Sequence, residues 1–151
     1  MGASMRVTSS SFAVGSAIPA RFTCRGADVS PALRWDPAPD GTQSIALSAI
    51  DPDAPGRPFV HWLVFNMPSA TMDLAEGAAP PEGSVLGRND FGSSGYRGPC
   101  PPPGSPHHYH FKVYALDMKL GLRPGASESA FQDAIKDHVL ATGEIVGTFK
   151  R

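Results

Sequence analysis

The apolar residues of this chain occur in short runs that turn-forming residues separate. Residues 44–50 and 59–67 are almost entirely apolar, which is typical of strands that are buried on both faces of a sheet. Residues 109–117 and 144–149 predict two further strands, and residues 18–23 predict a short one. Because prolines or glycines bound most of these runs, the pattern predicts several strands joined by tight turns.

One segment has a helical pattern instead. Ser127 is a suitable N-cap, and apolar side chains follow it at helical spacing, so we expect a helix near 128–140 that ends before Gly143. The expected apolar face of this helix consists of Phe131, Ala134, Ile135 and Val139. One helix among several strands predicts a mainly β, antiparallel domain with small helical additions.

The composition limits what the protein can be. A length of 151 residues predicts one domain over residues 1–151, and 16 glycines and 16 prolines predict many turns. The formal net charge is −1 and the basic residues form no stripe, which argues against a nucleic-acid partner. No apolar run approaches the ~18 residues of a membrane span, so we predict no transmembrane segment.

The N-terminus and the cysteines are relevant to the cellular location of the protein. Residues 1–4 precede Met5 and are typical of a cloning remnant ahead of a native start. The chain has no secretory signal pattern, so we predict a cytoplasmic location. Cys24 and Cys100 are the only cysteines, and in a cytoplasmic domain we expect them to be free thiols.

The first of two polar segments runs from Asp51 to Pro55, and His61 follows it. Asp51 ends a buried strand and precedes a proline, which restricts its backbone and gives its carboxylate a defined direction. If the two flanking strands are neighbours, Asp51 can meet His61 at one end of the sheet. A carboxylate beside an imidazole orients the ring and favours its charged form.

The second polar segment begins with a proline-rich turn at Gly98 and continues into a strand. His107 and Tyr109 are expected on one face of that strand, and His108 and His110 on the other. Gly98 permits a close backbone approach, and its amide could donate to an anion.

Together the two segments supply a carboxylate, two imidazoles, a phenol and the amides of Gly98 and Cys100. This set favours a pocket for phosphate or a similar oxyanion. Three other interpretations stay open: His61 as an ordinary core histidine, the four residues 107–110 as a metal cluster, and the Asp51 segment as a simple turn.

The same residues identify the chain as similar to the phosphatidylethanolamine-binding proteins, in the prokaryotic branch called Raf kinase inhibitor-like. Both polar segments match the signatures of that family, and residues 22–24, 30–35 and 89–92 add supporting matches. The resemblance implies an antiparallel β-sandwich with a pocket for phosphate or phosphorylethanolamine groups. The ligand-binding residues that it implies are Asp51, Pro55, His61, Gly98, Cys100, Pro101, His107 and Tyr109.

We therefore expect a non-enzymatic protein that binds a small anionic group, such as a phospholipid headgroup or a phosphorylated ligand. We expect no catalytic residue, cofactor or metal. The first alternative is an interaction module that inhibits a kinase or a protease through the pocket and its rim. The second is a small hydrolase in which Asp51 and His61 act as base and orienter.

Overall fold

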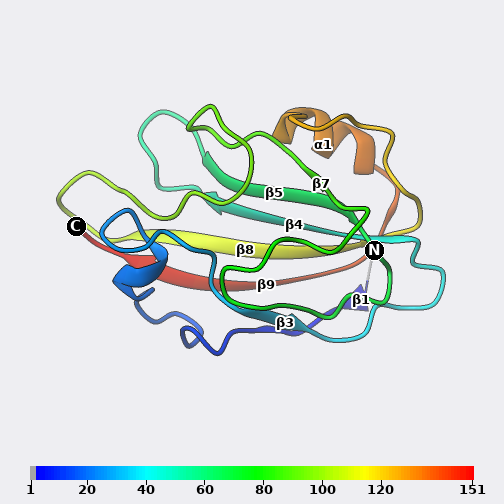
Figure 1. Cartoon of the computed structure of the whole chain (residues 1–151), viewed down its shortest axis with the longest axis horizontal. Coiled ribbons are helices and arrows are strands. Elements are labelled where there is room, and N and C mark those ends of the chain that lie inside the picture. The colour runs from blue at the N-terminus through cyan, green and yellow to red at the C-terminus, as the bar shows by residue number, and fades with distance from the viewer. Residues whose placement is uncertain (1–2) are drawn as a thin grey trace.

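The computed structural model describes residues 3–151, whose strands form two sheets (Figure 1). The larger sheet has the strand order β1-β9-β8-β4-β5-β7, and the smaller has the order β2-β3-β6. All pairings are antiparallel except that of β1 with β9. The strands are β1 (Ala3–Ser4), β2 (Val7–Thr8), β3 (Leu33–Trp35), β4 (Ser44–Asp51), β5 (Phe59–Met67), β6 (Asp73–Leu74), β7 (Val85–Leu86), β8 (His107–Leu116) and β9 (Val139–Phe149).

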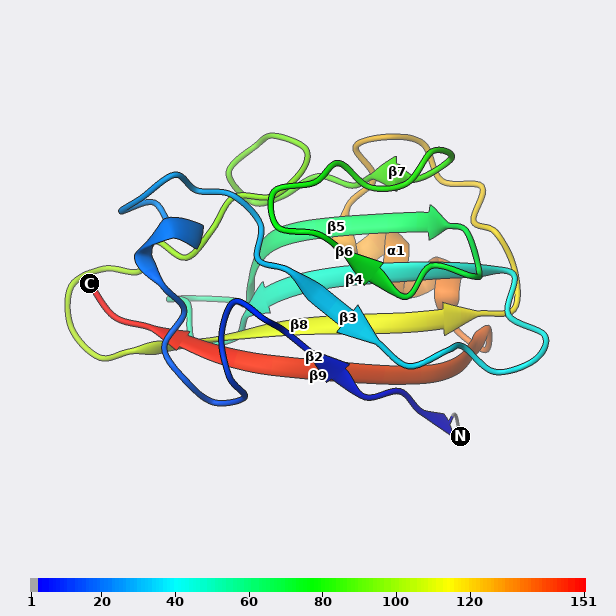
Figure 2. The ribbon, with the colours of Figure 1, turned by 60° about the horizontal axis from the view of Figure 1, so that its bottom comes forward.

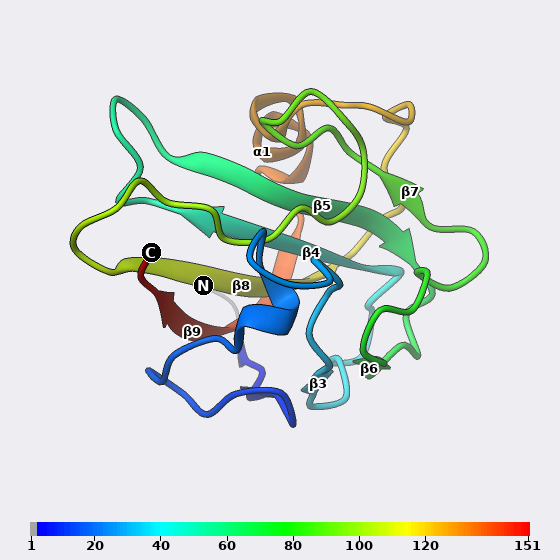
Figure 3. The same ribbon diagram turned by 60° about the vertical axis from the view of Figure 1, so that its left-hand side comes forward.

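The large sheet is covered on both faces. The small sheet packs against one face, as Figure 2 shows, and the helix α1 (Glu128–Ile135) lies on the other face (Figure 3). Trp35, Leu47 and Phe111 belong to the core between the sheets, while Phe65 and Phe131 belong to the core under the helix. The predicted mainly β, antiparallel sandwich is confirmed, and burial on both faces explains why β4 and β5 are continuously apolar.

Three of the predicted strands are present with small shifts of their ends, but the predicted strand at 18–23 is wrong. Ala20–Phe22 forms a 3₁₀ turn, η1, instead. The amide of Phe22 donates to the Pro19 carbonyl (3.0 Å), and the Thr23 hydroxyl donates to the Ala20 carbonyl (2.8 Å). These local bonds take the place of a sheet ladder, because threonine readily bonds to nearby backbone.

The predicted helix is too long, and the predicted last strand is too short. The helix ends at Ile135, and Asp137 has a positive φ of 67°, which reverses the chain. Val139 therefore begins β9, and β9 continues through Gly143 rather than starting after it. A Cβ at Gly143 would collide with the carbonyl oxygen of Met5, so this glycine permits the N-terminal segment to cross β9 closely.

The predicted cloning remnant over residues 1–4 lies partly outside the described residues, since the structure describes the chain from residue 3. Ala3 and Ser4 form β1 and pair with Ala141 and Thr142 of β9. Within residues 3–151, no helix has the length and apolar character that crossing a membrane requires.

Candidate ligand-binding site

A cavity of about 210 Å³ lies at the end of the large sheet where β4 ends and β5 and β8 begin. All the predicted site residues except Gly98 line it. The full lining is Asp51, Ala54, Pro55, Phe59, His61, Phe91, Cys100, Pro101, Pro102, His107 and Tyr109. Segments far apart in the sequence therefore meet around one hollow.

Asp51 is bonded to His107 rather than to His61. The Nδ1–H of His107 donates to Oδ2 of Asp51 over 2.6 Å, and the amide of Asp53 donates to Oδ1 of Asp51 over 2.8 Å. The Asp51 residue is only 3% exposed, so the pair is shielded from water. The expectation that Asp51 orients His61 is therefore wrong.

The pairing of β4 with β8 brings this partner within reach. Strand β4 lies between β5 and β8, and Ile50 pairs with His110 of β8. His107 lies two residues beyond Tyr109 on the same face of β8, which makes it a diagonal neighbour of Asp51. Diagonal side chains in an antiparallel pair lie within reach of each other when they are long or aromatic.

His61 is held by backbone instead. Its Nδ1 lies 2.7 Å from the carbonyl oxygen of Arg97. A carbonyl can only accept, so Nδ1 carries the proton, and Nε2 of the neutral ring is an acceptor. Burial lowers the pKa of His61, although the Arg97 carbonyl and the charge of Asp51 oppose this shift. The ring is therefore neutral at pH 7.

A β-bulge directs His61 into the cavity. Ala49 pairs with Trp62 and Ile50 with Val60, so His61 is the additional, unpaired residue of β5. Strict alternation would place His61 on the face opposite Trp62, whereas the bulge lets its ring contact Tyr109 at 5.3 Å between ring centroids. Bulges often redirect a side chain in this way beside a functional site.

The hydroxyl of Tyr109 is buried and has no hydrogen-bond partner among the described residues. The residue is 1% exposed. Burial and the nearby charge of Asp51 raise the pKa of Tyr109. The phenol therefore keeps its proton and remains free to donate, which is unusual because nearly all buried polar groups are paired.

Gly98 has a structural role that the sequence analysis missed. Its amide donates to Oδ1 of Asp28 over 2.8 Å, so the expectation that this amide serves an anion is wrong. A Cβ at Gly98 would collide with the carbonyl oxygen of Phe22, which means that the glycine permits close packing of two backbone segments rather than the approach of a ligand.

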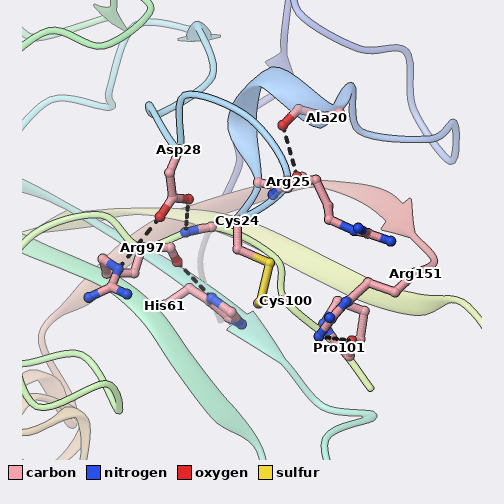
Figure 4. Close-up of a disulfide and its surroundings, with 11 residues drawn as sticks. Ala20, Cys24, Arg25, Asp28, His61, Arg97, Cys100, Pro101 and Arg151 are labelled. Carbon is pink, nitrogen blue, oxygen red and sulfur yellow. Dashed lines mark hydrogen bonds and ion pairs between the residues drawn. A yellow bond between two sulfur atoms is a disulfide. The ribbon is translucent and has the colours of Figure 1, made fainter. Parts of the chain in front are cut away.

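Cys24 and Cys100 form a disulfide, so the expectation of free thiols is wrong (Figure 4). The amide of Cys24 donates to the Pro99 carbonyl over 3.1 Å. This bond and the contact at Gly98 hold the two segments side by side, with the two cysteine Cα atoms 5.4 Å apart. The two cysteines are 76 residues apart in the sequence, and no local pattern predicts that they are in contact.

The sequence analysis also missed the aromatic part of the lining. The ring centroid of Phe91 lies 4.9 Å from that of Phe59 and 5.5 Å from that of His61. The guanidinium of Arg97 lies 4.6 Å from the centre of the Phe91 ring. The amides of Phe91 and Ser93 donate to Oδ1 of Asn89, which fixes the turn that carries Phe91. The Asn-x-Phe-Gly sequence of this turn is the feature from which the position of Phe91 could have been predicted.

The other two histidines of β8 lie outside the cavity, as alternation predicts. His108 donates from Nδ1 and from its amide to Oδ2 of Asp53, over 2.8 Å each. These bonds lower the pKa of Asp53. His110 lies 3.4 Å from a carboxylate oxygen of Glu144. The four residues 107–110 therefore do not converge on one point.

Solved structures with this architecture are known. The chain aligns with Escherichia coli YbcL, described as a member of the mammalian PEBP family, at a TM-score of 0.92 and 36% identity, over 99% of each chain. It aligns with a PEBP homologue of Chlamydia trachomatis, CT736, at a TM-score of 0.91 and 35% identity, over 98% of each chain.

Sequence comparisons agree with the structural ones. A UPF0098 protein of Methanothermobacter thermautotrophicus is 46% identical over 138 residues, which cover 89% of this chain and 91% of that protein. A Mycobacterium tuberculosis relative named a candidate lipoprotein, LppC, is 40% identical over 97% of this chain and 72% of its own. Residues 8–150 match the family model described as phosphatidylethanolamine-binding protein. The chain therefore belongs to the phosphatidylethanolamine-binding protein family.

Proposed function

We propose that the cavity binds a small anionic group, either phosphate or a phosphorylethanolamine-type headgroup. The observation that carries this proposal is the buried hydroxyl of Tyr109, which has no partner among residues 3–151. An unpaired buried hydroxyl costs about 1–3 kcal/mol. A ligand oxygen that accepts this hydrogen bond would recover that free energy.

Two imidazole nitrogens complete the ligand-facing set. The Nδ1 atoms of His61 and His107 are bonded to Arg97 and Asp51, which leaves Nε2 of each ring for a ligand. These contacts also fix the rings, so little entropy is lost on binding. The apolar residues of the lining lower the local polarity, which strengthens each polar contact. These residues are Pro55, Phe59, Phe91, Pro101 and Pro102.

The charge of Asp51 determines which form of an anion the site prefers. Neutral His61 offers an acceptor at Nε2, and Asp51 adds negative charge to the cavity. A fully deprotonated oxyanion is therefore disfavoured. A phosphate monoanion can donate its P–O–H to Nε2 of His61 and accept from the hydroxyl of Tyr109. A phosphate dianion can bind instead if His61 takes up a proton, so the complex holds the same number of protons in both cases.

The experiment is a titration with inorganic phosphate and with phosphorylethanolamine, followed by NMR of the histidine rings. We expect the signals of His61 and His107 to shift together. Tyr109→Phe removes only the hydroxyl and should weaken binding about fivefold to a hundredfold, the equivalent of the 1–3 kcal/mol that pairing of the hydroxyl recovers. Tyr114→Phe is the matched control, because Tyr114 lies in the core under the helix.

Two outcomes would count against the proposal. The first is a set of histidine signals that stays unmoved at millimolar phosphate. The second is an affinity that Tyr109→Phe leaves equal to that of the wild type. Turnover of phosphomonoesters or esters that is lost in Asp51→Ala and His61→Ala would instead support the hydrolase alternative.

One observation favours the interaction module as a second candidate. Phe91 lines the cavity and is nevertheless 38% exposed, so a partner could contact its ring and the cavity together. A kinase or a protease would be such a partner. Phe91→Ala should then abolish capture of that partner, whereas Val14→Ala, at another exposed apolar position, should not.

The compartment is a separate question. The cytoplasmic location stays a prediction from the sequence. The disulfide is more typical of an oxidising compartment, or of a redox-responsive protein in the cytoplasm. Cell fractionation with an antibody against the native protein would decide between these locations.

A further inference from the structure

The Cys24–Cys100 disulfide lies at the surface and forms part of the cavity wall. Cys24 is exposed, and Cys100 is partly exposed and lines the cavity. Exposed disulfides are open to attack by thiolates and are more often labile or regulatory than buried ones. The position of this bond therefore joins two properties, access for a thiol and contact with the proposed ligand site.

Two arginines, Arg25 and Arg151, lie near the disulfide, on the same side of it in Figure 4. Arg25 follows Cys24 directly and is exposed. Nη1 of Arg151 lies 3.4 Å from the carbonyl oxygen of Pro101, the residue after Cys100. Guanidinium groups stabilise thiolates, both the one that attacks and the one that leaves.

The disulfide is more important for the position of the backbone after Cys100 than for the position of the backbone before it. Before Cys100, the bonds of Gly98 to Asp28 and of Cys24 to Pro99 hold the backbone independently. After it, among the described residues, the segment 101–106 makes a single hydrogen bond, the one from Arg151. Breaking the disulfide would therefore leave the turn at η1 attached but free Pro101 and Pro102, which line the cavity.

We propose that Cys24–Cys100 is a thiol-reducible bond that controls the cavity wall. A thiolate of a small thiol or dithiol attacks Sγ of Cys24, the more exposed of the two residues. The S–S bond breaks, a mixed disulfide forms at Cys24, and Cys100 leaves as a thiolate that takes up a proton. A second thiolate of the reductant then releases Cys24, so the reductant becomes a disulfide and the protein gains two electrons and two protons.

Reduction then weakens the ligand site, and this consequence rests on the proposed function. Since the coupling is reciprocal, a bound anion must also make the disulfide harder to reduce. If reduction weakens phosphate binding about tenfold, saturating phosphate lowers the reduction potential by about 30 mV, the value for a two-electron couple.

The first experiment tests reduction alone. The oxidised full-length protein is treated with glutathione or dithiothreitol at pH 7 without denaturant, and thiols are trapped with iodoacetamide and counted by mass spectrometry. We expect both cysteines to be alkylated in protein that keeps its β-sheet circular dichroism. Arg25→Gln should slow reduction by glutathione severalfold, while Arg123→Gln, at a distant exposed arginine, should not. Reduction only in denaturant would overturn the inference.

The second experiment tests the coupling. We expect reduction to shift the NMR signals of Tyr109 and His107 and to leave those of Phe131, under the helix, in place. Inorganic phosphate should bind the reduced protein about tenfold more weakly, and an equal affinity would overturn the coupling. If phosphate does not bind the oxidised protein, the proposed function fails, but the trapping result and the Tyr109 signals still decide whether the disulfide controls the wall.

Discussion

Asp51, which is buried, and His107, whose side chain is 14% exposed, form a pair across β4 and β8, with 2.6 Å between Oδ2 and Nδ1. A few residues away, Asp53 and His108 form the same kind of pair at 2.8 Å, but both side chains are largely exposed. The two pairs share their chemistry and differ in burial. They therefore offer a comparison within one protein of what burial adds to an aspartate–histidine bond.

The first prediction uses this comparison. Asp51→Asn should lower the free energy of unfolding by about 1–3 kcal/mol, because it removes a charged acceptor from a buried bond. Asp53→Asn should change it by at most about 1 kcal/mol, since exposed pairs contribute little. Urea denaturation monitored by tryptophan fluorescence measures both. Equal effects of the two substitutions would contradict the assigned burial of the Asp51–His107 bond.

The second prediction concerns pH and His61. Burial lowers the pKa of His61 in the folded protein, so the unfolded chain binds more protons as the pH falls below about 6.5. Stability due to this residue should therefore be fully present above that pH and should decline as the pH decreases, until the folded-state pKa is passed. Urea midpoints of the wild type and of His61→Gln between pH 5 and 8 should show this slope only in the wild type.

A third prediction follows for ligand affinity. Because His61 is neutral and Asp51 lies nearby, binding of inorganic phosphate should take up a proton or select the monoanion. The affinity should therefore increase as the pH falls from 8 toward 6. Calorimetry in two buffers of different ionisation enthalpy would report the proton directly. An affinity that increases with pH would contradict the assigned neutral state of His61.

The sequence was sufficient for the parts of the fold that depend on local pattern. Strands β4 and β5 follow from continuous apolar runs, and the alternation in β8 correctly placed His107 and Tyr109 together. The partner of Asp51 could not be predicted, because both neighbouring strands supply a histidine near its end. The strand order does not decide between them, since β5 and β8 both lie beside β4; the carbonyl of Arg97, which binds Nδ1 of His61, leaves His107 as the partner of Asp51.

Features that depend on contacts between distant segments could not be predicted from the sequence either. The bulge at His61 depends on the register of β4 and β5, and nothing in the local sequence marks it. The disulfide and the role of Gly98 both arise because the turn at Phe22 packs on a segment that lies far along the chain. The close approach predicted at Gly98 is present, but the group that approaches this glycine is the backbone of Phe22 and not a ligand.

The fourth prediction tests that close approach. Gly98→Ala should lower the free energy of unfolding by about 1–3 kcal/mol or more, because the new methyl group collides with the Phe22 carbonyl and with Asp28. Gly121→Ala is the control, since a Cβ there meets no atom within 4 Å. Gly98→Ala should also reduce phosphate affinity, because the displaced segment leads into Cys100. A mutant as stable as Gly121→Ala would contradict the packing described.

The last prediction concerns the stability that the disulfide supplies. The bond closes a long loop, with a sequence separation of 76 residues, so its removal restores much chain entropy to the unfolded state. The chain-entropy model gives about 4 kcal/mol for a loop of this length. The variant Cys24→Ala/Cys100→Ala should therefore unfold at a clearly lower denaturant concentration than the oxidised wild type.

The reduced wild type serves as the control for this variant, because it lacks the bond but keeps both sulfur atoms. The two should have equal stability if the effect comes from the cross-link, whereas a further loss in the alanine variant would measure the packing of the sulfur atoms. The several bonds that hold Asp28 and Pro99 do not require the disulfide, so both proteins should remain folded in the absence of denaturant. A double mutant that unfolds completely would show that those bonds cannot hold the turn at η1 in place without the disulfide.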